Sequence, residues 1–424
     1  MNTPKLFDKL ISICGDIKKF DKSSLPLCAA ENVISPFSQI PLDSFLQEKY
    51  IMGGVSMYQA ANNFIGSDRL FQLYNLLQEQ CFKLFQAEYS DARTLSGVNA
   101  VTTLLMSLFS TGDKILLLSE DAGGHSSMPK ICTRLGLIPM YLPYDFQNYD
   151  LDYNSVNKII EREDIKGILL CPSDIIKLPE LKRIHLSKET VLIFDATQVL
   201  GIIASGNIDN PFDWFSRDDN FILLGATHKT LSGPTCGLIM TNNMRLASRF
   251  DTKINPDYLR NVQLHHIVSL ILALMEFEII GSEYSSLVVR NANILADSLK
   301  SKAFVPIEIF GGYSYTHQVF ISMEKDKAME FYKSCEHYGV TLNLRQRKIY
   351  KTCGIRIGTQ QISRYGWSDS EMVDIAIILE MIRDAHQDGN LICDKIKELS
   401  LKKTLKFTLD EELHNEIYSV LHDS

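Results

Sequence analysis

Five short runs of apolar residues constrain the fold of this chain more than any other feature of its sequence. Each run is four or five residues long, shows no polar alternation, and in most cases ends at Ser, Asp, Gly or Asn. Such runs are typical of strands buried on both faces of a parallel sheet. Helical patterns lie between several of them, so the sequence predicts an α/β fold with helices on both faces. The runs are 114–118, 167–171, 191–194, 221–224 and 237–240.

A second group of strand patterns follows a long helical pattern that begins near residue 264. These runs, at 319–322, 340–343 and 355–357, are separated by helical segments and predict a smaller α+β domain. We therefore expect four parts in the 424-residue chain. They are an N-terminal arm (1–45), a large α/β domain (46–279), a small α+β domain (280–385) and a helical C-terminal tail (386–424).

The composition excludes several classes of protein. With 45% hydrophobic and 22% charged residues the chain is typical of globular proteins. A net charge of -8 argues against a nucleic-acid-binding surface. The nine cysteines form no CxxC pair, which indicates neither a disulfide framework nor a zinc or other metal site. The N-terminus lacks the apolar core of a signal peptide, and the apolar stretch 267–274 is shorter than the about 20 residues that span a bilayer. We expect a cytoplasmic protein without nucleic-acid or membrane partners.

Residues suited to chemistry follow the predicted strands, where open α/β sheets bind their ligands. Asp195 ends one run, and Lys229 comes shortly after the next. A buried lysine has a lowered pKa and forms Schiff bases with carbonyls, pyridoxal phosphate among them, and such a cofactor needs an acid at its ring nitrogen. Gly123-Gly124-His125 supplies an imidazole that can stack on a ring, and Ser96-Gly97 opens a helix whose N-terminus suits a phosphate. Alone, each of these signals is as typical of a cap, a turn or a surface pair; their combination on successive strands is what indicates a cofactor site.

The segment 226–234, Ala-Thr-His-Lys-Thr-Leu-Ser-Gly-Pro, resembles the lysine motif of the serine hydroxymethyltransferase family. The similarity extends to Ala30-Glu31-Asn32, to Glu48-Lys49-Tyr50 and to 354–359, Gly-Ile-Arg-Ile-Gly-Thr. The resemblance implies a fold-type I pyridoxal-phosphate enzyme, with a mostly parallel seven-stranded sheet in the large domain and a smaller α+β C-terminal domain. It also implies an amino-acid substrate, pyridoxal 5'-phosphate as cofactor, and a homodimer or tetramer with shared active sites.

The resemblance also assigns roles to individual residues. The catalytic group would be Lys229, Glu31, His125, Asp195 and Tyr58. The cofactor would contact Ser96, Gly97, His125, Ser173, Asp195, Gln198, Thr227, His228 and Lys229. The substrate would contact Arg356, Glu31 and Tyr50. In this scheme Glu31 takes the proton of the β-hydroxyl and Arg356 holds the carboxylate.

Several positions depart from the folate-dependent members of the family. Val98 and Gln198 replace a serine and a histidine, 255–264 replaces a glycine-rich loop, and 343–354 is shorter than the loop that packs against folate. The segments 315–320 and 409–413 look more like the threonine transaldolase branch. We therefore expect an aldol or transaldol transferase that acts without folate on an amino acid and an aldehyde acceptor. Three alternatives remain open: a folate-dependent serine hydroxymethyltransferase, an aminotransferase-type enzyme, and a non-catalytic binding protein.

Overall fold

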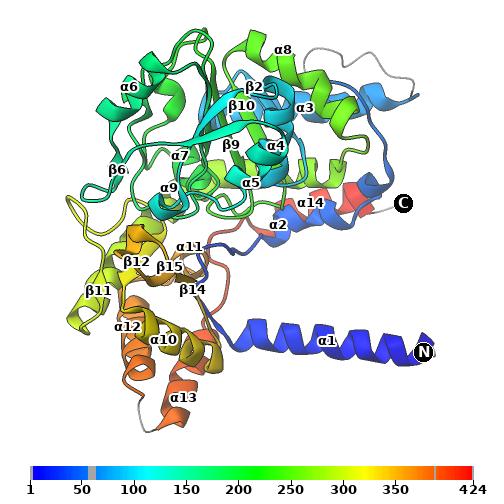
Figure 1. Cartoon of the computed structure of the whole chain (residues 1–424). Coiled ribbons are helices and arrows are strands. Elements are labelled where there is room, and N and C mark those ends of the chain that lie inside the picture. Colours follow the sequence, from blue (N-terminus) through cyan, green and yellow to red (C-terminus); the bar gives the residue numbers. More distant parts are fainter. Residues whose placement is uncertain (1–2, 56–63, 386–387, 423–424) are drawn as a thin grey trace.

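The computed structural model describes residues 3–55, 64–385 and 388–422, which form two lobes joined by one long helix (Figure 1). The larger lobe is built on a seven-stranded sheet with the order β2-β10-β9-β8-β7-β3-β4. Only β10 runs antiparallel to its neighbours, so the mostly parallel sheet of the predicted fold class is present. Its strands are β2 (Tyr89–Thr94), β3 (Lys114–Leu117), β4 (Ile138–Tyr141), β7 (Ile165–Leu170), β8 (Val191–Asp195), β9 (Phe221–Ala226) and β10 (Gly237–Thr241).

Two strands of this sheet, β2 and β4, do not come from the apolar runs. β4 lies at the edge of the sheet, where its side chains remain partly exposed. β2 reads Tyr-Ser-Asp-Ala-Arg-Thr and is nevertheless buried at every position. Burial of charged side chains is costly unless they are paired, so β2 requires partners inside the protein. Asp91 and Arg93 of β2 pair with each other at 2.6 Å, and the second carboxylate on Arg93, that of Asp251, comes from a distant part of the chain.

Helices cover the sheet and enclose one continuous hydrophobic core (Figure 1). α4 packs on β9 and β10, α5 packs on β3 and β4, and α3 packs on β2. The helices of this lobe are α3 (Ser67–Phe85), α4 (Gly97–Leu108), α5 (Met128–Arg134), α6 (Tyr153–Arg162), α7 (Leu200–Ala204) and α8 (Met244–Thr252).

The two lobes share α9 (Leu264–Ser301), a continuous helix of 38 residues. Its first part belongs to the core of the large lobe as far as Val288, and from Ala292 its buried side chains belong to a second core. The predicted domain boundary after residue 279 therefore falls inside this helix. By length and composition α9 could cross a membrane, but 61% of its most apolar window is buried inside the protein, which is the environment of a core helix.

The smaller lobe contains an antiparallel sheet with the order β11-β12-β15-β14 and a short parallel pair, β1 with β13. The run 340–343, expected as one strand, divides between β13 and β14, because each half pairs with a different sheet. The strands are β1 (Leu25–Pro26), β11 (Val305–Pro306), β12 (Gln318–Ser322), β13 (Val340–Thr341), β14 (Asn343–Arg345) and β15 (Gly354–Gly358). The helices are α10 (Lys325–His337), α11 (Gln360–Arg364), α12 (Asp369–Arg383) and α13 (Gly389–Ser400).

The two ends of the chain behave differently (Figure 1). α1 (Thr3–Ser23) projects away from both lobes, and its residues from Lys5 onward are exposed. α14 (Glu411–His422) instead returns to the large lobe beside α2 (Pro36–Gln39), where leucine and isoleucine side chains of the tail pack on a small cluster around Phe37 and Leu272. The arm that follows α1 crosses the smaller lobe as β1 before it reaches the large lobe.

Candidate active site

Asp195 lies at the carboxyl end of β8, next to β9 in the middle of the sheet. Its side chain is almost fully buried, and Oδ1 accepts hydrogen bonds from the backbone N–H (2.9 Å) and the hydroxyl (2.5 Å) of Thr197. Burial raises the pKa of this carboxyl above its usual value, and the Thr197 bonds only partly oppose the effect. Among the described residues no cation forms an ion pair with Asp195. The site therefore holds a buried carboxylate that lacks a positive partner.

Lys229 follows β9 in a tight turn. Its carbonyl accepts hydrogen bonds from the backbone N–H of Ser232 (3.0 Å) and from the side-chain amide of Asn32 (2.6 Å), so the N-terminal arm helps to fix the turn. The side chain is only partly covered, yet enough protein surrounds the amine to lower its pKa to about 8. Burial is the main cause, the positive charge of Arg356 adds to it, and Asp195 opposes it. At pH 8 about half of this amine is uncharged, whereas a lysine of ordinary pKa stays almost fully charged there.

His125 is held by a loop that requires its two glycines. Gly123 has a φ of +92°, and a Cβ on Gly124 would lie 2.1 Å from the carbonyl oxygen of Leu118. The backbone N–H of His125 donates to the Cys171 carbonyl at 2.8 Å, and its Nδ1 accepts the Ser127 N–H at 3.2 Å. Burial lowers the pKa of the imidazole, while Asp195 opposes and Lys229 adds to this change. The loop thus places a neutral imidazole within electrostatic reach of Asp195 and Lys229.

Ser96 and Gly97 form the N-terminus of α4. The Ser96 hydroxyl caps the helix by accepting the Asn99 N–H at 3.2 Å. A Cβ on Gly97 would lie 3.1 Å from the Cβ of Ala226 and 3.3 Å from Oγ1 of Thr197, so the glycine lets the helix start against the end of β9. The N-terminus of α4, which is suited to a phosphate, therefore lies next to the end of the strand that leads to Lys229.

The two residues before Lys229 have different environments. His228 is half-buried. Burial is the main cause that lowers its pKa to about 4, and the positive charge of Lys229 adds to the effect. Its Nδ1 is buried and has no hydrogen-bond partner within the described parts of the chain. Thr227 instead donates its hydroxyl to the carbonyl of Pro234, which stabilises the turn. Of these two predicted cofactor contacts, the Thr227 hydroxyl is already bonded within the protein, whereas the buried Nδ1 of His228 has no partner among the described residues.

Ser173 and Gln198 both meet the small lobe. The Ser173 carbonyl accepts hydrogen bonds from Nη1 of Arg356 (2.6 Å) and from the amide of Gln318 (3.1 Å). The same Gln318 amide donates to Oε1 of Gln198 at 3.0 Å. Gln318 was not singled out from the sequence, and it joins the small-lobe sheet to two predicted cofactor contacts.

Arg356 lies on β15 and is almost completely buried. Its Nε and Nη2 donate to Oδ1 of Asn343, at 3.2 and 2.8 Å, and its Nη1 contacts Oδ1 of Asp174 at 3.2 Å besides the Ser173 carbonyl. Burial lowers the pKa of the guanidinium, and Asp174 opposes this effect. The group is therefore fixed at the junction of the two lobes.

Three charged residues at this junction were missed from the sequence: Asp174, Arg345 and Arg347. Arg345 and Arg347 both form ion pairs with Asp174, the carboxylate that also binds Arg356. A signal for them exists, because Asn343, Arg345 and Arg347 alternate with the period of a strand and all contact Asp174 or Arg356. The sequence did not show that a strand so placed would face the Lys229 site.

Of the predicted site residues that the structure describes, Glu31 and Tyr50 are not brought to this cluster in the single chain. Glu31 is exposed, and the contacts it makes are through its backbone. Tyr50 is also exposed, and its ring packs against Phe64 with centroids 4.6 Å apart. Tyr58 lies outside the described residues.

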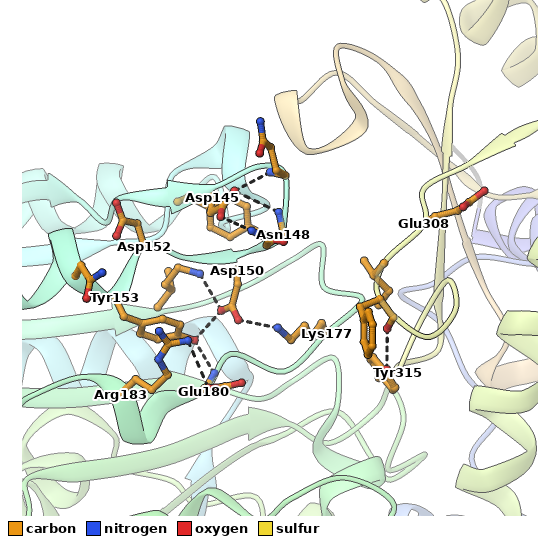
Figure 2. A pocket seen from close by; sticks show the side chains of 16 residues that line it. Asp145, Asn148, Asp150, Asp152, Tyr153, Lys177, Glu180, Arg183, Glu308 and Tyr315 are labelled. Carbon is orange, nitrogen blue, oxygen red and sulfur yellow. Dashed lines mark hydrogen bonds and ion pairs between the residues drawn. The ribbon is translucent and has the colours of Figure 1, made fainter.

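A separate groove of about 860 Å³ lies between the large lobe and the loop 308–315 (Figure 2). Figure 2 shows Asp150 at its base, bonded to Lys177 (2.8 Å) and to the hydroxyl of Tyr153 (2.6 Å), with Glu308 on the opposite wall. None of the predicted site residues lines this groove. The acid-rich groove is thus distinct from the Lys229 cluster.

Comparisons with known proteins agree with this geometry. The family profile described as serine hydroxymethyltransferase matches residues 6–379. A serine hydroxymethyltransferase of Archaeoglobus fulgidus is 29% identical over 93% of this chain and 91% of its own, and one of Korarchaeum cryptofilum is 28% identical over 94% and 96%. The crystal structure of an L-threonine transaldolase from Pseudomonas fluorescens in its internal aldimine state superposes with a TM-score of 0.91 and 22% identity, covering 99% of this chain and 98% of that one. This structural likeness establishes the fold.

Proposed function

The chain belongs to the serine hydroxymethyltransferase family, and within it we propose that the protein makes or breaks the Cα–Cβ bond of a β-hydroxy-α-amino acid without folate. The observation that carries this proposal is the cluster formed by Lys229, Asp195 and His125, which follow strands of the large sheet, and by Arg356, which the small-lobe strand β15 contributes. Burial lowers the pKa of Lys229 and of His125; the Arg356 charge adds to the effect at Lys229, the Lys229 charge adds to it at His125, and Asp195 opposes both.

The residues at the site fit pyridoxal phosphate, the cofactor of this family. Asp195 is a buried carboxylate that forms no ion pair among the described residues, so it could pair with a protonated ring nitrogen. His228 has a buried nitrogen without a partner among the described residues. At the start of α4, Gly97 lets the helix begin close to Ala226 and Thr197 at the end of β9, and the N-terminus of this helix is suited to a phosphate.

We assign the cofactor contacts on this basis. Lys229 would hold the aldehyde carbon, Asp195 the ring nitrogen, His125 a face of the ring, and Ser96 with Gly97 the phosphate. Bound there, the cofactor supplies an electron sink for the pair left on Cα when the Cα–Cβ bond breaks.

The small lobe would bind the amino-acid carboxylate. Arg356 is held in place by Asn343 and the Ser173 carbonyl, so it is preorganised before a substrate arrives. A carboxylate paired with this buried guanidinium is oriented as well as bound. Because Arg356 lies on β15 and Lys229 follows β9, the substrate would be held between the two lobes.

His125 would act on the oxygen at Cβ. Its Nδ1 accepts the Ser127 N–H, so in the neutral ring the proton is on Nε2. Nε2–H can therefore donate to the hydroxyl of the amino acid or to the oxygen of the aldehyde. Glu31, expected to remove the hydroxyl proton, stays a prediction, since its exposed side chain lies outside the cluster in the single chain.

The segment 343–354 supports the folate-independent form of the proposal. Instead of leaving space beside the site, it folds back on the large lobe: Arg347 bonds to Asp174 and to the Gly124 carbonyl, and Tyr350 donates to Asp174 at 3.0 Å. Folate-dependent serine hydroxymethyl transfer is the second candidate, and the curated relatives favour it.

The projecting helix α1 supports a homodimer. Leu6, Leu10, Ile13, Ile17 and Phe20 follow the 4-3 spacing of a heptad seam and are exposed by 46–64%. A seam of this kind requires a second surface, and we propose that another copy of the chain provides it. Ile17→Glu should then give a smaller species than the wild type in light scattering, while Lys18→Glu, on the same helix, should not.

The test of the reaction is incubation of the cofactor-loaded enzyme with L-threonine and a second aldehyde, with and without tetrahydrofolate. We expect acetaldehyde and a new β-hydroxy-α-amino acid in both cases, and loss of activity by at least about a thousand-fold in Lys229→Ala. A keto acid as product would indicate transamination instead. Turnover that requires both serine and tetrahydrofolate would support the second candidate.

A further inference from the structure

The junction of the two lobes holds three guanidinium groups on one carboxylate. Asp174 is fully buried, and its Oδ1 lies 3.1 Å from Nε of Arg345 and 3.2 Å from Nη1 of Arg356. Its Oδ2 accepts a hydrogen bond of 2.5 Å from Nη1 of Arg347. A single negative charge therefore faces three positive ones.

Nearby carboxylates do not restore the balance. Glu120 is the other acid that Arg347 reaches, at 4.0 Å, and its side chain is half exposed. Counting Glu120 fully, the cluster still has three cations for two anions. Positive charge that is partly removed from water without a partner is unfavourable, and an anionic ligand would relieve that cost.

The three arginines differ in how many donors they have left. A guanidinium has five N–H groups. Arg356 uses four of them, on Asn343, Ser173 and Asp174. Arg345 contacts Asp174 through Nε, which forms no satisfactory hydrogen bond, and within the described residues its two terminal amino groups have no partner. Arg345 is thus the arginine with the most unused donors, and its side chain is 22% exposed.

The surplus charge lies beside the proposed active site. Arg347 donates to the Gly124 carbonyl at 3.0 Å, and Gly124 directly precedes His125. The charge of Arg345 contributes to the lowered pKa of both Lys229 and His125. An anion bound by Arg345 and Arg347 would therefore sit next to the groups that contact the substrate.

We propose that Arg345 and Arg347 form a second anion subsite, distinct from the carboxylate site of Arg356. It would bind the substituent on Cβ of the amino acid, the group that leaves or enters as the aldehyde, and this substituent would end in a carboxylate or a phosphate. The inference rests on the proposed function and narrows its substrate class to anionic aldehydes and the amino acids made from them.

A purely structural role makes a different prediction. If the arginines only joined the lobes, their loss would affect all aldehydes equally. Arg347 bonds to both Asp174 and Gly124, so its removal risks the fold. Arg345 is the better position to change, because it is the least embedded of the three.

The kinetic test compares anionic aldehydes with neutral ones of similar shape. The donor is L-threonine, and the acceptor pairs are 4-oxobutanoate with 4-oxobutanamide, and glycolaldehyde phosphate with glycolaldehyde. In the wild type we expect kcat/KM to favour the anion of at least one pair by about 10- to 100-fold. Arg345→Gln should lower kcat/KM for the anionic aldehyde of that pair much more than for the neutral one, so that most of the preference is lost, and Arg345→Lys should keep part of it.

A matched control is available three positions further along. Lys348→Gln removes the same charge, but its ammonium lies over the Phe146 ring at 4.3 Å and does not bind Asp174. This variant should keep the wild-type preference. If Lys348→Gln and Arg345→Gln lost the preference for anionic aldehydes to the same extent, long-range charge and not a subsite would set that preference.

A binding measurement provides a readout independent of turnover. By calorimetry on the holoenzyme, succinate should bind at least about 10-fold more tightly than succinamate, and Arg345→Gln should abolish the difference. The pair that shows the preference identifies the anion as carboxylate or phosphate. Turnover of neutral aldehydes without any anion preference would overturn the subsite while leaving the proposed function intact. Absence of turnover with every aldehyde, together with equal binding of succinate and succinamate, would overturn both.

Discussion

Two buried charge clusters of this protein have opposite ratios of cations to anions. Around Arg93, on β2, one guanidinium meets two carboxylates, those of Asp91 and Asp251, and all three side chains are completely buried. Around Asp174, one carboxylate meets three guanidiniums that keep some exposure. The first cluster is closed off from solvent, whereas Arg345 and Arg347 of the second keep 22% and 10% of their side chains exposed.

The guanidinium of Arg93 finds its hydrogen-bond acceptors within the chain. Arg93 donates to Asp91 through Nε (3.0 Å) and Nη2 (2.6 Å), to Oδ1 of Asp251 (2.8 Å), and to the carbonyl of Gly53 (2.7 Å). Tyr89 adds a bond of 2.9 Å to Asp251. The backbone is close as well, since a Cβ on Gly54 would lie 2.3 Å from Asp251. A cluster whose donors are used within the chain stabilises the fold, whereas one with unused donors is available to a ligand.

The largest expected effect is on the closed cluster. Arg93→Ala removes the guanidinium that pairs with both buried carboxylates, and we expect the free energy of unfolding to fall by about 3–5 kcal/mol. Urea unfolding followed by circular dichroism measures it. Arg93→Lys keeps the charge but not the two-pronged bond to Asp91 and should lose less. Similar, small losses in both variants would show that the cluster is not a structural element.

Asp174→Asn tests the open cluster in the same way. Loss of the Asp174 carboxylate leaves three arginines without the anion that they share. Because these side chains are partly exposed, water replaces part of the interaction, and we expect the free energy of unfolding to fall by about 1–3 kcal/mol. Added succinate should restore more stability to this variant than to the wild type, because a ligand that binds only the folded state stabilises it. If succinate instead stabilised Arg93→Ala to the same extent, the distinction between the clusters would fail.

The surplus positive charge should also be visible in the titration of Lys229. With a pKa of about 8, lowered chiefly by burial and then by Arg356, the amine loses its proton as pH rises through 8. Reductive methylation of the cofactor-free protein, read by mass spectrometry, should therefore rise at Lys229 between pH 7 and 9. Arg345→Gln removes a positive charge and should move this rise to higher pH. An unchanged pH profile in the variant would mean that Arg345 lies too far from Lys229 to affect its pKa.

The smallest effect is expected at an exposed cluster with the same ratio as that of Arg93. Lys166 contacts Asp164 at 2.9 Å and Glu189 at 2.5 Å, with both carboxylates largely exposed. Surface pairs contribute little, so Lys166→Ala should leave the midpoint of urea unfolding unchanged within error. A marked shift would mean that charge ratio, and not burial, determines stability in these clusters.

The sequence predicted the parts of the fold that depend on local pattern. The unalternating runs become β3, β7, β8, β9 and β10, and the long helical pattern begins at Leu264 as α9 does. A motif such as that around Lys229 is also local, because its turn is closed by bonds within the segment 227–233. The strand β2 was missed because its burial depends on Asp251, which is 158 positions from Arg93.

For the site, the sequence alone identified the family of this chain, since Lys229, Asp195, His125 and Arg356 stand in motifs that resemble those of the family. Only the tertiary structure showed that Arg345 and Arg347 meet Asp174, which lies 173 positions from Arg347. The physical reason is that a side chain's preference for strand or helix is set by its neighbours along the chain, whereas its charge is balanced by whatever the fold brings within a few ångströms.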